Sequence, residues 1–271
     1  MGSWSLDDIA WDRFDPAGVD PEILRIVKAA SLVERNGGDY AHYLCNVFAD
    51  DPLFQDAARR WGAEEIQHGE ALGRWAMLAD PGFDHAVACA RFTAGFRVPL
   101  DADVSVRGSR AGELVARCIV ETGTSSYYTA LAEATSEPVL RQICRHIAAD
   151  EFRHYKLFYT HLKRYLARER LGFWGRLRIA LGRVAESEDD ELAFAYHAAN
   201  QPDLPYDRNR AVREYARRAY PLVRPHHVQR GVAMILKAVG LTPNGRLGVW
   251  ATRIAWWRIA RKAQRLARAA T

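Results

Sequence analysis

Four stretches of this sequence carry apolar residues at alternating spacings of four and three positions. This spacing places the apolar residues on one side of an α-helix, so each stretch is expected to form an amphipathic helix. Such helices bury their apolar sides by packing around a shared core, and no stretch has the alternation typical of strands. The chain is therefore predicted to be all-α. The expected helices span residues 21–49, 52–79, 110–135 and 137–168.

The connections between these helices predict how they are arranged. The links within the first pair and within the second pair are short, whereas residues 81–109 join the two pairs and contain glycines and prolines. Short links within pairs and one long crossover are typical of a four-helix bundle. We expect the bundle at residues 21–168, an N-terminal extension at residues 1–20, and a C-terminal helical extension at residues 169–271.

Each apolar side is interrupted near its middle by a glutamate, and two of the glutamates are followed three positions later by a histidine. An i, i+3 pair lies on one helix face, so both side chains should point into the core. Burying four carboxylates together is prohibitively costly unless positive charge compensates them. Two metal ions would do so, and this is the ligand set of di-iron carboxylate bundles. The predicted ligands are Glu34, Glu65, His68, Glu121, Glu151 and His154.

The chain order of these residues also favours a metal site. Glu34 and Glu65 are 31 residues apart, and Glu121 and Glu151 are 30 residues apart. Two similar helical hairpins would thus each supply one glutamate and one E-x-x-H motif. The alternative for Glu34 and Glu121, taken singly, is a surface position on an amphipathic helix.

Two stretches of the sequence carry a resemblance to a known family. "WGAEEIQHGEAL" at residues 61–72 and "QICRHIAADEFRHYKLF" at residues 142–158 resemble the metal-binding helices of soluble acyl-carrier-protein desaturases, within the ferritin-like di-iron superfamily. The resemblance covers about residues 30–165. It implies a ferritin-like bundle in which Glu65 and Glu151 bridge two metals. It further implies that Glu34 and Glu121 are terminal carboxylates, that His68 and His154 are nitrogen ligands, and that Asp150 orients a ligand histidine.

The chain also departs from that pattern. The first helix matches poorly, and Val120-Glu121-Thr122 replaces the desaturases' glutamine, glutamate and arginine. Aldehyde-deformylating oxygenases and bacterioferritins share the same ligand skeleton, so the skeleton does not select one reaction.

Four further residues near the predicted ligands have two interpretations each. Gly37 and Gly38 either leave room for oxygen or an acyl chain beside the metals or allow close helix packing. Thr124 is either a proton relay or a helix residue that bonds back to a carbonyl. Tyr128 is either a redox or proton partner beside a substrate channel or a core tyrosine. His226 and His227 receive no role.

Positive charge is concentrated at the C-terminus. The net charge is +5, but residues 246–271 contain seven Arg or Lys and no acid, so the rest of the chain is close to neutral. A helical stripe there comprises Val249, Thr252, Trp256, Ile259, Ala263 and Leu266. A basic amphipathic helix suits an anionic membrane surface or an acidic acyl carrier protein, and it could also simply dock on the bundle. Nucleic acid is not an expected partner.

The four cysteines and the N-terminus bear on the compartment. The cysteines form no C-x-x-C pair, and the chain starts with neither a basic flank nor an apolar run. We expect reduced thiols, no signal peptide, no membrane-spanning helix and a cytoplasmic location, with a peripheral membrane position as the alternative.

The favoured function is an O2-dependent di-iron oxidase or oxygenase that desaturates or hydroxylates an apolar, fatty-acyl type of substrate. The cofactor is expected to be two iron ions, with manganese or a mixed pair as alternatives. Electrons would come from a separate donor, because the sequence has no Gly-rich nucleotide loop and no iron–sulfur cysteine set. A ferroxidase or peroxide scavenger and a membrane-surface protein with a structural metal pair are the alternatives. A homodimer is compatible with each.

Overall fold

The computed structural model describes residues 4–186, 190–243 and 245–268. Over these residues the chain forms helices and no strand, which confirms the all-α bundle. Three single-turn helices, η1 to η3, precede the longer ones. The bundle elements are α1 (Pro21–Arg35), α2 (Gly37–Val47), α3 (Pro52–Ala79), α5 (Arg110–Ala134) and α6 (Pro138–Leu166). The others are η1 (Leu6–Asp8), η2 (Trp11–Arg13), η3 (Pro16–Gly18), α4 (His85–Gly95), α7 (Phe173–Ala185), α8 (Asp190–Asn200), α9 (Arg208–Ala219), η5 (Tyr220–Leu222), α10 (Pro225–Val239) and α11 (Arg246–Arg268).

Three bundle helices begin with the same device, an acidic residue followed by proline. The side chain of Asp20 accepts a hydrogen bond from the backbone N–H of Glu22 at 2.7 Å, and the side chain of Asp51 accepts one from the backbone N–H of Phe54 at 3.1 Å. Glu137 caps α6 in the same way. Proline fits the first helical position because its missing N–H would have no partner there, and the acid satisfies the next free amides. These local signals set the starts of α1, α3 and α6.

The first predicted helix is in fact two. It ends at Arg35, and α2 starts at Gly37, with Asn36 (φ −80°, ψ −1°) between them. The prediction of one helix over residues 21–49 was therefore wrong. Two adjacent glycines weaken a helix by roughly 1 kcal/mol each against alanine, which makes this the weakest point of the stretch. The break falls just beyond Glu34, one of the predicted ligands.

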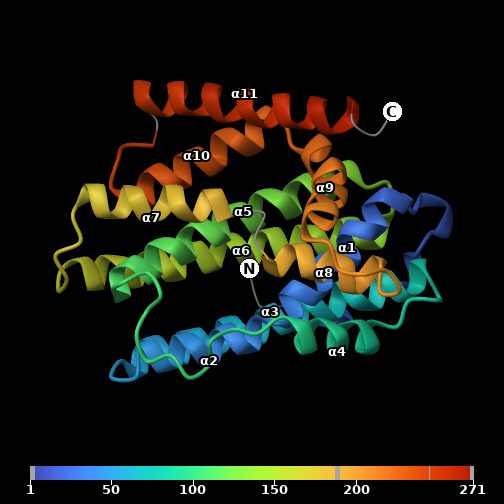
Figure 1. Ribbon diagram of the computed structural model, residues 1–271, viewed down its shortest axis with the longest axis horizontal. Helices are drawn as coiled ribbons and strands as arrows, with labels where there is room; N and C mark the ends of the chain where they lie inside the picture. Colours follow the sequence, from blue (N-terminus) through green and yellow to red (C-terminus); the bar gives the residue numbers. More distant parts are fainter. Residues whose placement is uncertain (1–3, 187–189, 244, 269–271) are drawn as a thin grey trace.

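The bundle pairs α5 with α6, and α3 packs against both α1 and α2 (Figure 1). Two apolar clusters fill the bundle. One lies between the end of α3 and the start of α6 and includes Trp75 and Ile143, and the other includes Phe54 and Phe158 at the opposite ends of the same helices. The predicted ligands occupy the layer between the two clusters, at the middle of the helices.

The C-terminal extension covers the bundle. Tyr196 of α8 is fully buried in the first apolar cluster, and Met234 of α10 accepts a hydrogen bond from the Tyr155 hydroxyl at 2.8 Å. In Figure 1, α7 and α10 lie on the α5 side, and α11 runs along the outer edge. In the described residues, no helix is both long enough and apolar enough to cross a membrane.

Candidate metal centre

The structure brings all six predicted ligands together at the centre of the bundle. Their ligand atoms form two overlapping groups in which all atoms lie within 4.8 Å of one another. Glu65 and Glu151 belong to both groups. The two residues that the resemblance implied as bridges are therefore shared by two potential metal positions. The first group is Glu34, Glu65, His68 and Glu151, and the second is Glu65, Glu121, Glu151 and His154.

The Nε2 atom of each histidine, on the side of the ring away from the cluster, contacts a carboxylate of the opposite helix. Nε2 of His68 on α3 lies 3.1 Å from the carboxylate of Asp150 on α6. Nε2 of His154 on α6 lies 2.7 Å from the carboxylate of Glu64 on α3. When Nε2 carries the proton of this bond, Nδ1 presents its lone pair to the cluster, as a metal ligand requires. Asp150 thus has the predicted orienting contact.

Glu64 was missed by the sequence reasoning, although a signal for it exists. Glu64 immediately precedes Glu65, just as Asp150 immediately precedes Glu151. The internal symmetry of the two hairpins extends one residue beyond the ligands, and Glu64 is the symmetry counterpart of Asp150.

The donor atoms of the cluster fit a pair of cations. Glu65 is 8% exposed and Glu34 is 5% exposed, and the other four residues are at most 2% exposed. Each of the six nevertheless has a buried polar atom without a hydrogen bond of ordinary geometry. The six atoms face one another, at 3.0 Å between Nδ1 of His154 and Oε1 of Glu65 and at 3.2 Å between Nδ1 of His68 and Oε1 of Glu151. Buried donors and acceptors need partners, and metal ions between these atoms would satisfy all six. These atoms are Oε2 of Glu34, Oε1 of Glu65, Nδ1 of His68, Oε2 of Glu121, Oε1 of Glu151 and Nδ1 of His154.

The pKa values of the clustered residues are shifted in the directions expected for buried carboxylates that lack compensating positive charge. Burial, followed by repulsion from Glu151, raises the pKa of Glu121 to about 8. The same two causes raise the pKa of Glu65 well above its usual range. Burial alone would lower the pKa of His68, but hydrogen bonds to Asp150, Glu151 and other carboxylates raise it well above its ordinary value. Without metal, the cluster must hold protons in order to stay buried.

Two hydroxyl groups contact the cluster. Thr124 Oγ1 donates to Oε2 of Glu151, and it also lies 3.3 Å from the carbonyl oxygens of Val120 and Glu121. Both interpretations of Thr124 are therefore compatible with its position. The Tyr128 hydroxyl donates to Oε1 of Glu34 at 2.6 Å, and this tyrosine is 1% exposed. Tyr128 positions a carboxylate from within the core.

The N-terminal extension closes the site on the His68 side. The Trp4 indole N–H donates to Asp150 at 2.7 Å, and the Trp4 ring stacks on the His68 ring with centroids 6.0 Å apart. The sequence pattern did not reveal this contact. It links the extension to the residue that orients His68.

The two glycines beside Glu34 have different surroundings. A Cβ added at Gly37 would lie 2.2 Å from the Glu65 Cβ, so this glycine allows α2 to pack directly on α3. A Cβ at Gly38 would meet only the end of the flexible Ile66 side chain, at 3.2 Å. The space beside Gly37 is filled by a predicted ligand, so at this position close packing, and not a wider channel, explains the glycine.

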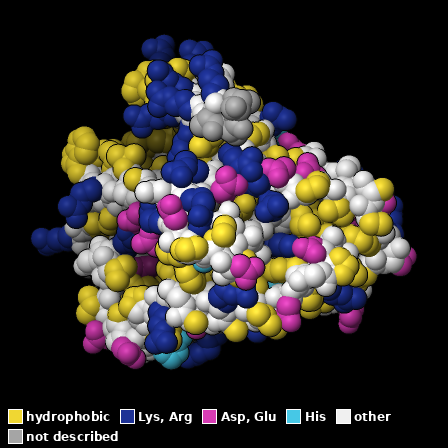
Figure 2. All heavy atoms as spheres, turned by 45° about the vertical axis from the view of Figure 1, so that its right-hand side comes forward, with side chains coloured by type: hydrophobic (Ala, Val, Ile, Leu, Met, Phe, Trp, Pro, Cys, Tyr) yellow, Lys and Arg dark blue, Asp and Glu magenta, His cyan; other side chains and the backbone are white. Residues whose placement is uncertain are grey.

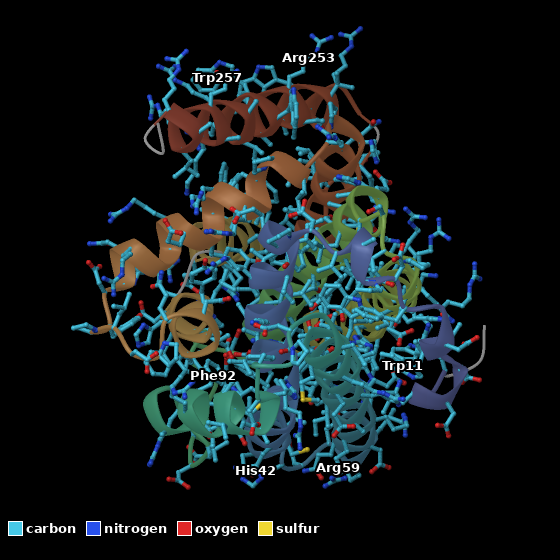
Figure 3. The ribbon with its side chains drawn as sticks, turned by 90° about the vertical axis from the view of Figure 1, so that its right-hand side faces the viewer. Trp11, His42, Arg59, Phe92, Arg253 and Trp257 are labelled. Atoms are coloured by element: carbon cyan, nitrogen blue, oxygen red, sulfur yellow. The ribbon has the colours of Figure 1, made fainter. Side chains whose placement is uncertain are left out.

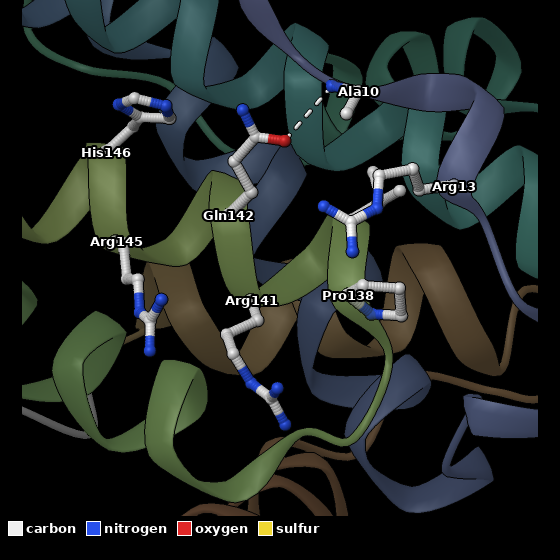
Figure 4. A pocket seen from close by; sticks show the side chains of 8 residues that line it. Ala10, Arg13, Pro138, Arg141, Gln142, Arg145 and His146 are labelled. Atoms are coloured by element: carbon white, nitrogen blue, oxygen red, sulfur yellow. Dashed lines mark hydrogen bonds between the residues drawn. The ribbon is translucent and has the colours of Figure 1, made fainter.

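Two surface pockets lie along α6. One is lined by the N-terminal segment and by α6 residues 138–146, and it exposes Arg13, Arg141 and Arg145 (Figure 4). In that pocket the Gln142 side-chain oxygen accepts a hydrogen bond from the backbone N–H of Ala10 at 3.0 Å. The second pocket lies between α5, α6 and Arg230. Neither is lined by any of the six clustered residues, so neither provides a route to the centre.

His226 and His227, to which the sequence assigned no role, both contact Glu133. Nε2 of His226 and Nε2 of His227 each lie 3.1 Å from Glu133 of α5. The backbone N–H of Arg224 donates to Nδ1 of His227 at 3.0 Å. Neutral His227 must therefore carry its proton on Nε2, which leaves that atom no lone pair for a metal. We interpret the group as a hydrogen-bonded link between α10 and α5.

Comparison with known proteins bears on the same helices. Residues 47–170 match the family model of fatty acid desaturases. This range contains five of the six predicted ligands and both orienting carboxylates, while Glu34 precedes it. A comparison with curated proteins found no match. The desaturase similarity thus covers the two E-x-x-H motifs and Glu121 of α5.

Proposed function

We propose that this protein is an O2-dependent di-iron oxidoreductase that acts on a C–H bond of an apolar, fatty-acyl type of substrate. The observation that carries the proposal is the convergence of six buried ligand atoms in two groups that share Glu65 and Glu151. The match of residues 47–170 to fatty acid desaturases supports the reaction class. When bound, a pair of iron ions would supply the reduction of dioxygen and the oxidant for C–H attack.

The side chains of the chain have distinct tasks in this proposal. Glu34, Glu121 and the two histidines would each hold one metal, and Glu65 and Glu151 would hold both. Asp150 and Glu64 would fix the orientation of the histidine rings, because each carboxylate accepts a hydrogen bond from an Nε2–H group. The Thr124 hydroxyl donates a hydrogen bond to Glu151, and in this proposal it would pass a proton at that carboxylate oxygen.

The burial of the centre suits oxidation of an organic substrate, and the desaturase match favours this reaction over ferroxidase activity. An oxidising centre must be kept from bulk water and stray reductants, and the clustered residues are at most 8% exposed. A separate electron donor belongs to the proposal.

The test combines metal analysis with turnover. Protein produced with iron and with manganese is analysed for metal content, and iron-loaded protein is incubated with long-chain fatty-acyl thioesters, O2 and a reduced ferredoxin. We expect two metal ions per chain and an unsaturated or hydroxylated acyl product by mass spectrometry. Glu65→Ala should lose at least one metal and the product, whereas Glu70→Ala on the exposed side of α3 should retain both.

Two results would contradict the proposal. One is full metal occupancy in Glu65→Ala. The other is rapid oxidation of free Fe(II) by wild type with no organic product, which would point to a ferroxidase.

A further inference from the structure

Helix α11 lies at the outer edge of the molecule and is hardly buried. It is 23 residues long, and among the residues the structure describes in it only Gly248 is buried. Its inner side contacts α9, η5 and α10. The predicted stripe partly faces this way, since Thr252, Trp256 and Ile259 are half-buried. Val249, which was placed on the same stripe, is 54% exposed.

The outward side of α11 alternates arginine and tryptophan. Arg246, Trp250, Arg253, Trp257 and Arg261 are all exposed and follow one another at spacings of four or three, so they share one helix face. Trp250 is 63% exposed and Trp257 is 56% exposed. Figure 3 shows Arg253 and Trp257 above the helix, directed away from the bundle.

The charge of α11 has a single sign. The helix contains seven Arg or Lys and no Asp or Glu. The face visible in Figure 2 carries both signs over the body of the molecule, whereas Lys and Arg crowd its upper end, where α11 lies. Acidic side chains that could neutralise these charges within the helix are missing, so an anionic partner is the complementary surface.

The exposed tryptophans distinguish between kinds of anionic partner. Indole rings are large and apolar with one polar N–H, and they favour the boundary between water and lipid. The exposed apolar residues Leu247 and Val249 flank this face at the start of the helix. An acidic protein patch would pair with the arginines but would need matched apolar pockets for each tryptophan. A bilayer surface offers phosphates and an apolar layer beneath them along the full ~35 Å of the helix.

We propose that α11 is an interfacial helix that docks this protein on an anionic lipid bilayer. The arginines contact lipid phosphates, and Trp250 and Trp257 enter the headgroup region. The bundle side of α11 stays against α9 and α10, so the helices of the bundle need not unfold or move for docking. This inference goes beyond the proposed function and does not depend on it, because lipid binding is measured without turnover.

The test is co-sedimentation of the purified full chain with vesicles. Vesicles of phosphatidylcholine alone are compared with vesicles that also contain phosphatidylglycerol, at low and at high salt. We expect binding to the anionic vesicles, weak binding to the neutral ones, and loss of binding in high salt.

Variants assign the binding to the outward face. Arg253→Glu with Arg261→Glu should weaken partitioning at least about tenfold, and Trp250→Ala with Trp257→Ala should do so by about tenfold. Arg59→Glu is the matched control, because Arg59 is an exposed arginine at the opposite end of the molecule (Figure 3). Far-ultraviolet circular dichroism shows whether each variant is folded.

Three outcomes would overturn the proposal. The first is no binding of wild type to anionic vesicles at low salt. The second is equal binding by wild type and the folded α11 variants. The third is binding of an acidic polypeptide such as polyglutamate or an acyl carrier protein, reduced by the α11 variants, without vesicle binding; this would assign the helix to a protein partner.

Discussion

Replacing Gly37 with alanine should destabilise the protein and disturb its metal centre through a single methyl group. The added Cβ would lie 2.2 Å from the Glu65 Cβ and 3.0 Å from its Cγ. Ordinary contact between such atoms begins near 3.4 Å, so α2 and α3 must separate by about 1 Å at this point. The atom that is displaced belongs to a predicted bridging carboxylate, and not to a surface side chain that could rotate away.

Two opposing effects set the magnitude. Overpacking in a well-packed interior costs about 1–3 kcal/mol, whereas alanine in a helix gains at most ~1 kcal/mol over glycine. The free energy of unfolding of metal-free protein should therefore fall by about 1–2 kcal/mol. The displaced Glu65 should also weaken metal binding, because ligand positions must be held to within about 0.5 Å.

The adjacent Gly38 provides a matched control. Its added Cβ would come closest to Cδ1 of Ile66, at 3.2 Å, at the end of a flexible side chain. Gly38→Ala should therefore be neutral or stabilising by up to about 1 kcal/mol, and should keep both metals. Urea unfolding of the metal-free proteins and metal content of the iron-loaded proteins are the measurements. Equal stability of the two variants, or full metal occupancy in Gly37→Ala, would refute the close-packing argument.

Two further predictions concern carboxylates outside the ligand set. Asp150→Asn and Glu64→Gln should each weaken metal affinity by about 10–100-fold, measured by competition with a chelator, and unchanged affinity would show that ring orientation does not depend on them. Burial raises the pKa of Asp51, but hydrogen bonds from Tyr165 and the Phe54 amide outweigh it and hold this pKa below its ordinary value of 3.8. Asp51→Ala should therefore lower the free energy of unfolding by about 1–2 kcal/mol at pH 7. The difference in this free energy between wild type and variant should shrink as the pH falls below 3.8, because the Asp51 carboxylate becomes protonated. The same difference at pH 7 and at pH 3, measured by urea unfolding, would contradict this assignment.

The sequence by itself determined three of the four bundle helices and the six candidate ligands that meet at their centre. The bounds of α3 agree with the expected residues 52–79, because Asp51 and Pro52 start the helix and its apolar spacing continues to its end. The ligand positions follow from the same periodicity, since a glutamate on an apolar stripe must face the core of a bundle. Helix-start residues and apolar periodicity both depend only on residues close together in the chain, so they can be read from the sequence.

Only the tertiary structure decided which segments come close to that centre. The Gly37 contact with Glu65 and the Trp4 contact with Asp150 each join residues that are far apart in the chain. The exposure of Trp257 was also decided by the tertiary structure. The periodicity of α11 shows that the helix has two sides, but it does not show which side the rest of the protein covers. Helical spacing fixes the direction of a side chain around its own axis, whereas the distance to another helix is set by the packing of all of them.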